Sequence, residues 1–393
     1  MDRLQAIQTT NAKNGHLLGI AILIAFLLPH SSVLLQLANP LLCLLMVYKS
    51  KGRKFTPLVY AVIVPIVLSL LTNAAVVTQK AFLSTFTVLL YFACFPIVGS
   101  FKINNIYLYV CLGYIFISQV CYMFGVSFLV NLFDRLYPID EFRANSYEQM
   151  KNSISYITMF DYRLGGFYHN PNQCSRYITM LLAFFLVVNQ GVKSKGILVF
   201  TAIAYIAVLL TGSRTGFVVA SLILYFGLLR QKAYSGNTRY LFLAIAVAGI
   251  GYILESGYAL RGLNVEEGMS GSANIKWETF VYYLTNEQNF FTLLVGHLDP
   301  SLFVVHSALV MEHFDSEYGE LIFRYGIIGF LGIFFFWWKT AMRIHKTERF
   351  FFLLLLWTIS STIVASYRAL FIFMLFLSII YSNNVISSCK KGV

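Results

Sequence analysis

The residues best suited to chemistry lie in one short stretch, 313–326, where a charged loop runs into an apolar helix. Only 12% of the chain is charged and 58% is hydrophobic, yet His313, Asp315, Glu317 and Arg324 all fall here. A carboxylate or an imidazole in such a place could take a proton from a hydroxyl group as a general base. Asp315 could equally cap the helix that follows and complement its dipole. The local sequence leaves both roles open.

A second group of polar residues precedes another apolar run. Its sequence, Arg163-Leu-Gly-Gly-Phe-Tyr-His-Asn-Pro-Asn172, ends in a turn signal. Pro171 suits the first turn of a helix, and Asn172 could cap that helix. This structural role leaves unexplained why Arg163, His169 and Arg176 gather at one expected membrane edge.

A third group, Ser213 and Arg214 between two glycines, interrupts the apolar stretch 196–230. That stretch is about twice as long as one membrane helix needs, so it must break here. Arginine near hydrocarbon costs about 2.5–3.5 kcal/mol on insertion scales and tends to face a cavity or a partner. An interfacial turn with a snorkelling arginine is the simpler alternative. We favour a binding site, because a guanidinium beside a hydroxyl suits phosphate oxygens.

Three further cations, Arg261, Lys276 and Arg368, fall on the expected outer side. Charges in long loops are weak topological signals, so Arg261 and Lys276 could be ordinary surface residues. Arg368 stands in a short turn and is harder to explain in that way. The aromatic run 277–283 is better explained by an interfacial belt than by stacking on sugar rings.

The composition indicates a polytopic membrane protein: mean hydropathy is +0.70 over 393 residues. The six cysteines lie mostly inside apolar runs without close pairing, which predicts neither a disulfide framework nor a zinc site. The net charge of +12 is informative here about topology, and no nucleic-acid partner is expected. We expect one all-α integral membrane domain over residues 1–393, without a cleavable signal peptide.

Apolar runs predict about twelve membrane helices, separated by two long polar segments, 131–171 and 256–317. Most lysines and arginines fall in short loops on the side of the two termini, where only Asp2 and Glu348 are acidic. The positive-inside rule therefore predicts cytoplasmic termini and places both long segments on the outer face. The expected spans are 17–29, 31–48, 57–78, 81–99, 106–130, 173–189, the two halves of 196–230, 240–255, 318–338 and the two halves of 350–386.

The order of these pieces resembles the O-antigen polymerase and ligase superfamily, which comprises membrane glycosyltransferases of the GT-C class. The Arg163 motif comes first, the Ser213-Arg214 break follows, and a large loop then leads to Asp315, eleven positions before Gly326 of a Gly-x-x-Gly helix. The resemblance implies a GT-C-like, multi-pass protein of the Gram-negative inner membrane. It would act on undecaprenyl-diphosphate-linked glycans at the periplasmic face, with no cofactor and no bound metal expected.

Within the superfamily, ligases carry His-Asn where this chain has Asp315 and Ser316, whereas Asp315-Ser-Glu-Tyr318 is similar to the Wzy-type polymerases. His313 stands only two positions away, which keeps a ligase assignment open. The family also places an arginine before a tryptophan of the large loop. Here Lys276 occupies that position, so Lys276 or Arg261 would take its role.

The resemblance thus implies a polymerase that joins lipid-linked repeat units by inverting glycosyl transfer. Asp315, or else His313 or Glu317, would be the base toward the acceptor hydroxyl. The donor and the acceptor would both be undecaprenyl-diphosphate-linked oligosaccharides in the bilayer, and a Wzz-type chain-length regulator is an implied partner. The diphosphate and sugar candidates are Arg214, Arg163, Arg176, Arg368, Ser213, His169, Asn172, Arg261, Lys276 and Tyr318.

Two alternatives remain from the sequence. One is the O-antigen ligase, which transfers the finished polymer to lipid A-core. The other belongs to a different class, a lipid-linked oligosaccharide flippase or another transporter. Transporters generally place charged groups near the middle of the bilayer, whereas the charges of this chain collect at the expected outer edge and in the two long segments.

Overall fold

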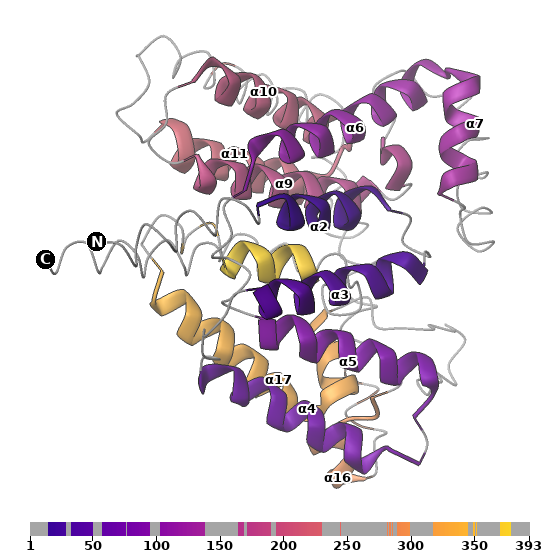
Figure 1. The fold of residues 1–393 in the computed structure, drawn as a ribbon, viewed down its shortest axis with the longest axis vertical. Coiled ribbons are helices and arrows are strands. Elements are labelled where there is room, and N and C mark those ends of the chain that lie inside the picture. The colour runs from indigo at the N-terminus through magenta and orange to yellow at the C-terminus, as the bar shows by residue number, and fades with distance from the viewer. Residues whose placement is uncertain are drawn as a thin grey trace, which may run out of the picture. The chain divides into compact units, whose positions relative to one another are not determined.

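The computed structural model describes residues 15–28, 33–49, 57–75, 77–94, 103–137, 164–168, 171–189, 194–229, 289–298, 317–344 and 370–378, and a few single residues between them. Every regular element in these ranges is helical, in agreement with the predicted all-α class (Figure 1). The chain divides into two compact units. The first comprises residues 1–21, 36–102 and 265–393, and the second comprises residues 22–35 and 103–264.

Two of the described helices are long and apolar enough to cross a membrane, Asn105–Phe124 and Leu321–Met342. The first has 20 residues, which gives a length of about 30 Å, the thickness of a hydrocarbon core. The other apolar helices of this part of the chain are shorter, at 10–17 residues. The described residues therefore have membrane character, but they do not confirm the twelve expected spans.

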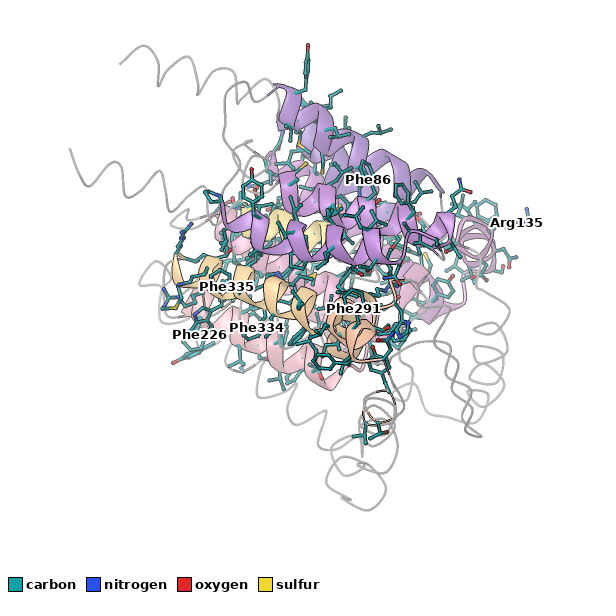
Figure 2. The ribbon with its side chains drawn as sticks, turned by 90° about the horizontal axis from the view of Figure 1, so that it is seen from below. Phe86, Arg135, Phe226, Phe291, Phe334 and Phe335 are labelled. Atoms are coloured by element: carbon teal, nitrogen blue, oxygen red, sulfur yellow. The ribbon has the colours of Figure 1, made fainter. Side chains whose placement is uncertain are left out.

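Large apolar side chains project from the helices of the first unit. Phe86, Phe291 and Phe334, labelled in Figure 2, are 49%, 56% and 48% exposed. Burying such a side chain away from water is worth about 1.5–3 kcal/mol. Surfaces of this kind are suited to hydrocarbon.

The second unit is built around one buried helix. It contains α6 (Asn105–Phe124), α7 (Ser127–Leu136), the 3-10 turn η3 (Gly166–Tyr168), α9 (Pro171–Val188), α10 (Lys195–Leu210), α11 (Arg214–Leu224) and the π-helical turn η4 (Tyr225–Leu229). Helices α6, α10 and α11 and the turn η3 all contact α9. Every residue of α9 from Cys174 to Val187 is buried as a result. The second half of α9, residues 180–187, is apolar on all sides, as expected for a helix at such a position.

The predicted interruption of the stretch 196–230 is confirmed, because α10 ends at Leu210 and α11 begins at Arg214. The predicted span 106–130 was too long. Helix α6 ends at Phe124, where Gly125 takes the left-handed conformation with φ 62°, and the separate helix α7 starts at Ser127. Glycine is the residue that adopts this conformation most readily, so it ends the helix.

The first unit contains most of α3 (Val33–Lys49), then η1 (Pro57–Val59), α4 (Tyr60–Thr72), α5 (Gln79–Cys94), α16 (Phe290–Val295), α17 (Glu317–Met342) and the helical segment 370–378. Helices α4 and α17 run antiparallel. Ser69 Oγ donates to the carbonyl of Arg324 at 3.2 Å, and Gly332 lies against the carbonyl of Ala61. A side chain at Gly332 would overlap that carbonyl, so glycine permits the close approach.

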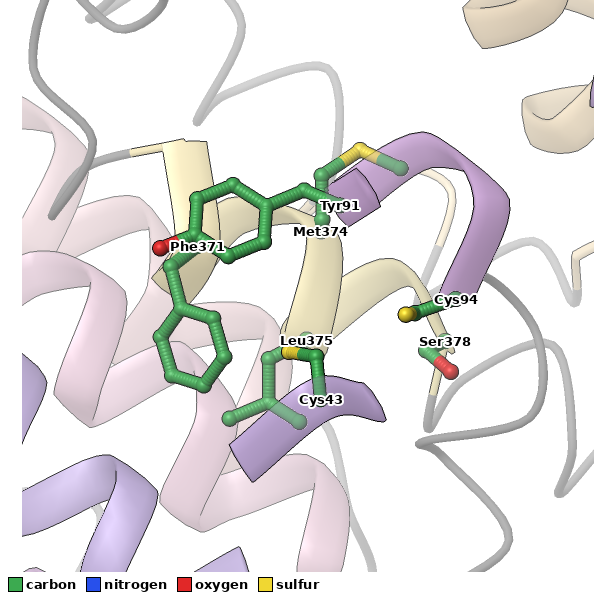
Figure 3. A pocket seen from close by; sticks show the side chains of 7 residues that line it. All are labelled: Cys43, Tyr91, Cys94, Phe371, Met374, Leu375 and Ser378. Carbon is green, nitrogen blue, oxygen red and sulfur yellow. The ribbon is translucent and has the colours of Figure 1, made fainter. Parts of the chain in front are cut away.

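A small cavity in the first unit lies between α3, α5 and the segment 370–378 (Figure 3). Its volume is about 10 Å³, enough for one water molecule at most. This is far too small for a sugar or a lipid chain. The five described cysteines are free, and two of them line the cavity, whose complete lining is Cys43, Tyr91, Cys94, Phe371, Met374, Leu375 and Ser378.

Candidate functional site

In chain order, the three motif segments are 163–172, 212–216 and 313–326. The first and the second meet in the second unit. The backbone N–H of Leu164, which follows Arg163, donates to the carbonyl of Leu210 at 2.9 Å, three residues before Ser213. The side chain of Gln119 donates to the carbonyls of Leu164 and Ala207, both at 3.0 Å. One buried amide of α6 therefore holds the first motif against the end of α10.

The second of the two glycines in the first motif has a structural explanation. Gly166 has φ 55°, in the left-handed region, and a side chain there would overlap Ser118 Oγ. The same Oγ accepts a hydrogen bond from the N–H of Phe167 at 3.3 Å. The motif turn, residues 166–168, therefore packs directly against α6, and only glycine at position 166 allows this contact.

The phenyl ring of Phe167 fixes the other side of the motif turn. It is 1% exposed and lies within an aromatic cluster. Ring centroids are 4.3 to 6.5 Å apart, a normal range for favourable aromatic pairs. The partner rings belong to Tyr114, Phe133, Tyr137 and Tyr168.

The first turns of α9 and α11 lie against each other. Ser213 is the N-cap of α11, and its side chain accepts from the N–H of Gly216 at 3.3 Å. A side chain at Gly216 would overlap Ser175 Oγ of α9. That hydroxyl is buried and has no hydrogen-bond partner within the described ranges. The structure thus assigns Ser213 to capping and adds Ser175, which sequence reasoning missed.

This junction of two helix starts is electropositive. The N-terminal ends of helices carry partial positive charge and present unsatisfied N–H groups. Arg176 follows Ser175 in α9 and is only 8% exposed. Arg214 is the first residue of α11. Backbone N–H groups, hydroxyls and arginines near helix starts are the usual components of a phosphate site.

The third motif segment belongs to the first unit and contains a helix break that the sequence did not predict. Within α17, Gly326 has φ 67° and ψ −179°. Its flanking carbonyls are satisfied from elsewhere, because His297 N–H donates to Phe323 at 2.8 Å and Leu298 N–H to Arg324 at 2.9 Å. A side chain at Gly326 would overlap the carbonyl of Leu294. Gly326 therefore allows close contact with α16, and the contact of α17 with α4 uses Gly332.

Arg324 lies next to this break and is 8% exposed. Its Nη1 donates to Ser84 Oγ of α5 at 3.2 Å, and its carbonyl accepts from Ser69 of α4. Buried arginines and broken helices inside candidate membrane spans are typical of functional positions. From sequence, Arg324 was one of the charged residues of the stretch 313–326 and had no assigned role. The signal was an arginine two positions before a glycine inside an apolar run.

Among the predicted binding residues, Ser213 and Arg176 are buried at the α9–α11 junction. Asn172 is exposed and lies inside the first turn of α9, so it is not the N-cap residue, whereas Pro171 does begin that helix as predicted. Arg214 begins α11, and Glu317 and Tyr318 begin α17, but the structure describes only their backbone. Residues outside the described ranges are Arg163, His169, Arg261, Lys276, His313, Asp315 and Arg368.

The described residues contain no group of three His, Cys, Asp or Glu side chains that could hold a metal ion. The groups that lie together at the α9–α11 junction are hydroxyls, helix N–H groups and the guanidinium of Arg176, which suit an anion. Comparison of the sequence with protein-family models and with curated proteins gives no match.

Proposed function

We propose that this chain is a membrane glycosyltransferase of the O-antigen polymerase type. It would join undecaprenyl-diphosphate-linked repeat units by inverting transfer at the periplasmic face of a bacterial inner membrane. The proposal combines the resemblance of the motifs with the geometry of the second unit. The two candidate spans and the outward-facing phenylalanines support its membrane location.

The observation that carries the proposal is the α9–α11 junction. Two motifs about 40 residues apart in the chain come together there, with the buried Arg176, the cap Ser213 and the buried hydroxyl of Ser175. A diphosphate has oxygens on two phosphorus atoms and needs several donors at once. Two adjoining helix starts and the buried Arg176 provide donors of this kind, and Arg214 would add its guanidinium.

In the proposed reaction, a hydroxyl of the incoming repeat unit attacks the anomeric carbon of the growing glycan. The bond from that carbon to the diphosphate oxygen breaks, and lipid diphosphate leaves with the bonding electron pair. Arg176 and Arg214 stabilise the charge that develops on the leaving group. Asp315, or His313 or Glu317 in its place, accepts the proton of the attacking hydroxyl.

The experiment that tests the diphosphate role compares Arg176→Ala with Arg176→Lys in cells that lack the native copy. We expect Arg176→Ala to abolish long-chain glycan, whereas Arg176→Lys, which keeps the charge but not the bidentate geometry, leaves partial chain length. Glycan length is read on a lipopolysaccharide gel, and protein amount in the membrane is the control. Wild-type chain lengths in Arg176→Ala would reject the role.

Deletion of the gene distinguishes the proposed activity from its rivals. A polymerase mutant should retain lipid A-core that carries a single repeat unit. Bare core together with accumulated lipid-linked polymer would identify a ligase. Bare core with lipid-linked single units held on the cytoplasmic face would identify a flippase.

A further inference from the structure

Helix α7 begins directly after the candidate membrane span α6. At the end of α6 the N–H of Gly125 donates to the carbonyl of Tyr122, and the N–H of Val126 donates to that of Cys121. These bonds close the helix, and the chain turns sharply at Gly125 into α7 (Figure 1). Helix α7 therefore starts at the level where α6 would leave the hydrocarbon.

Helix α7 has three different faces. Phe128, Leu132 and Leu136 repeat every four residues and therefore share one face. They are 76%, 42% and 49% exposed. The polar residues Ser127, Asn131 and Arg135 also repeat every four residues and form a strip alongside this face, with Arg135 next to Phe128 at the boundary, and Figure 2 shows Arg135 at the rim of the helix.

The third face of α7 is already used to hold the helix on the second unit. Phe133 is 5% exposed and contacts the rings of Tyr114 and Phe167, with centroids 5.6 and 6.5 Å apart. Tyr122 of α6 donates to Asp134 at 2.6 Å. The position of α7 is thus fixed without the face of Phe128, and no described residue of the second unit covers that face.

The end of α6 next to α7 also exposes apolar side chains. Ile117 and Phe124 of α6 are 55% and 68% exposed, and Phe124 and Phe128 stand on either side of the turn at Gly125, four positions apart in the chain. In a membrane-spanning α6, such side chains contact lipid. A helix with one polar face and one apolar face at that level is typical of the membrane interface.

We propose that α7 is an interfacial helix whose exposed face, Phe128, Leu132 and Leu136, contacts the acyl chains of the leaflet at the C-terminal end of α6. Asn131 and Arg135 face the lipid headgroups and water. Helices of this type lie with their apolar face about 5–10 Å into the headgroup and acyl boundary. The inference rests on one part of the proposed function, namely that α6 spans a membrane.

This placement has a consequence for the first motif. Phe167 stacks on Phe133 of α7. It also contacts Tyr137, the C-cap residue of α7, with ring centroids 4.6 Å apart. Helix α7 therefore connects the motif turn to the membrane surface. A lipid-linked diphosphate lies at that same depth, since its phosphates stay among the headgroups while its chain stays in hydrocarbon.

The test uses nitroxide labels on the full chain in lipid vesicles. The six native cysteines are replaced by alanine, and single cysteines are then introduced by Phe128→Cys, Leu132→Cys and Leu136→Cys on the apolar face. Ser127→Cys and Asn131→Cys are the matched controls on the polar strip, because Arg135 lies at its boundary with Phe128. Electron paramagnetic resonance then measures collision of each label with oxygen, which concentrates in lipid, and with a water-soluble nickel chelate.

We expect oxygen collisions to dominate at positions 128, 132 and 136, and nickel collisions to dominate at 127 and 131, so that the depth parameter changes sign between the apolar face and the polar strip. Nickel access at all five positions would place α7 in water and overturn the proposal. Low access of both reagents at the apolar positions would show a protein partner or a second copy of the chain instead. Where a labelled variant does not fold, tryptophan at that position and quenching by brominated lipid give the same comparison.

The measurement does not depend on catalysis. A chain that fails to polymerise glycan but shows lipid contact at Phe128 would refute the proposed function and keep this inference. An active polymerase whose α7 labels face water would keep the proposed function and refute this inference.

Discussion

Gly326 has a backbone conformation that other residues rarely adopt. Its φ of 67° costs an L-residue about 1–2 kcal/mol, and a side chain would also overlap the carbonyl of Leu294. We expect Gly326→Ala to lower the thermal unfolding midpoint in detergent. Gly113→Ala in α6 is the matched control, because a side chain there meets nothing within 4 Å and alanine favours a helix by about 1 kcal/mol. Equal midpoints for the two variants would refute the observed break.

Ser175 and Gly216 should behave as a coupled pair. Gly216→Ala forces a methyl group onto Ser175, and such overpacking costs about 1–3 kcal/mol. Ser175→Gly removes both clashing atoms at a helix cost of about 1 kcal/mol. We therefore expect the double variant to unfold at a higher temperature than Gly216→Ala alone. Additive effects in this double-mutant cycle would mean that α9 and α11 do not touch at these residues.

At the scale of single residues, the sequence predicted ionisable and capping residues better than their partners. Ser213 and Arg176 were predicted for the site, because a hydroxyl or an arginine near hydrocarbon is visible in any apolar run. Ser175 and Gln119 were missed. Each acts through a residue more than 40 positions away, and local spacing does not report such tertiary contacts. Arg324 was seen and given no role for the same reason.

At the scale of elements, apolar runs predicted most helices to within a few residues, but they did not predict where a helix changes character. The break at Gly326 depends on hydrogen bonds from His297 and Leu298. From sequence, the same glycine was only one member of a Gly-x-x-Gly pattern in an apolar helix. Helix α7 was divided between a span and a polar loop because its apolar face continues the pattern of α6 while its other face is polar.

The contact of Gln119 with the first motif gives a prediction about how elements are held together. Gln119→Leu removes the donor to the carbonyls of Leu164 and Ala207. A buried carbonyl left without a donor costs about 1–3 kcal/mol. We expect a lower unfolding midpoint and shortened glycan, because the motif turn is no longer held to α6 and α10. Gln79→Leu, at an exposed position of α5, should change neither.

At the scale of the whole molecule, the helix directions inside the first unit agree with the predicted topology. Helix α4 runs antiparallel to α17, as the contacts of Ser69 with Arg324 and of Ala61 with Gly332 require. From sequence, α4 is predicted to cross from the cytoplasm to the outer face, and α17 from the outer face to the cytoplasm. Opposite directions are necessary for that assignment, and the charge distribution decides which end faces the cytoplasm.

The charge rule leads to the last prediction. Lysines and arginines gather in short loops on the side of the termini, and moving them across the membrane is unfavourable. Alkaline phosphatase, which is active only outside the cytoplasm, should therefore be active when fused after Met150 or Ala273, within the two long segments. It should be inactive when fused after Lys193 or at the C-terminus. Phosphatase activity after Lys193 with none after Met150 would show that the chain has the opposite orientation in the membrane. In that case, the α9–α11 junction could not receive a lipid-linked donor from the outer face, and the proposed polymerase activity would have to be abandoned, whatever the effect of Arg176→Ala.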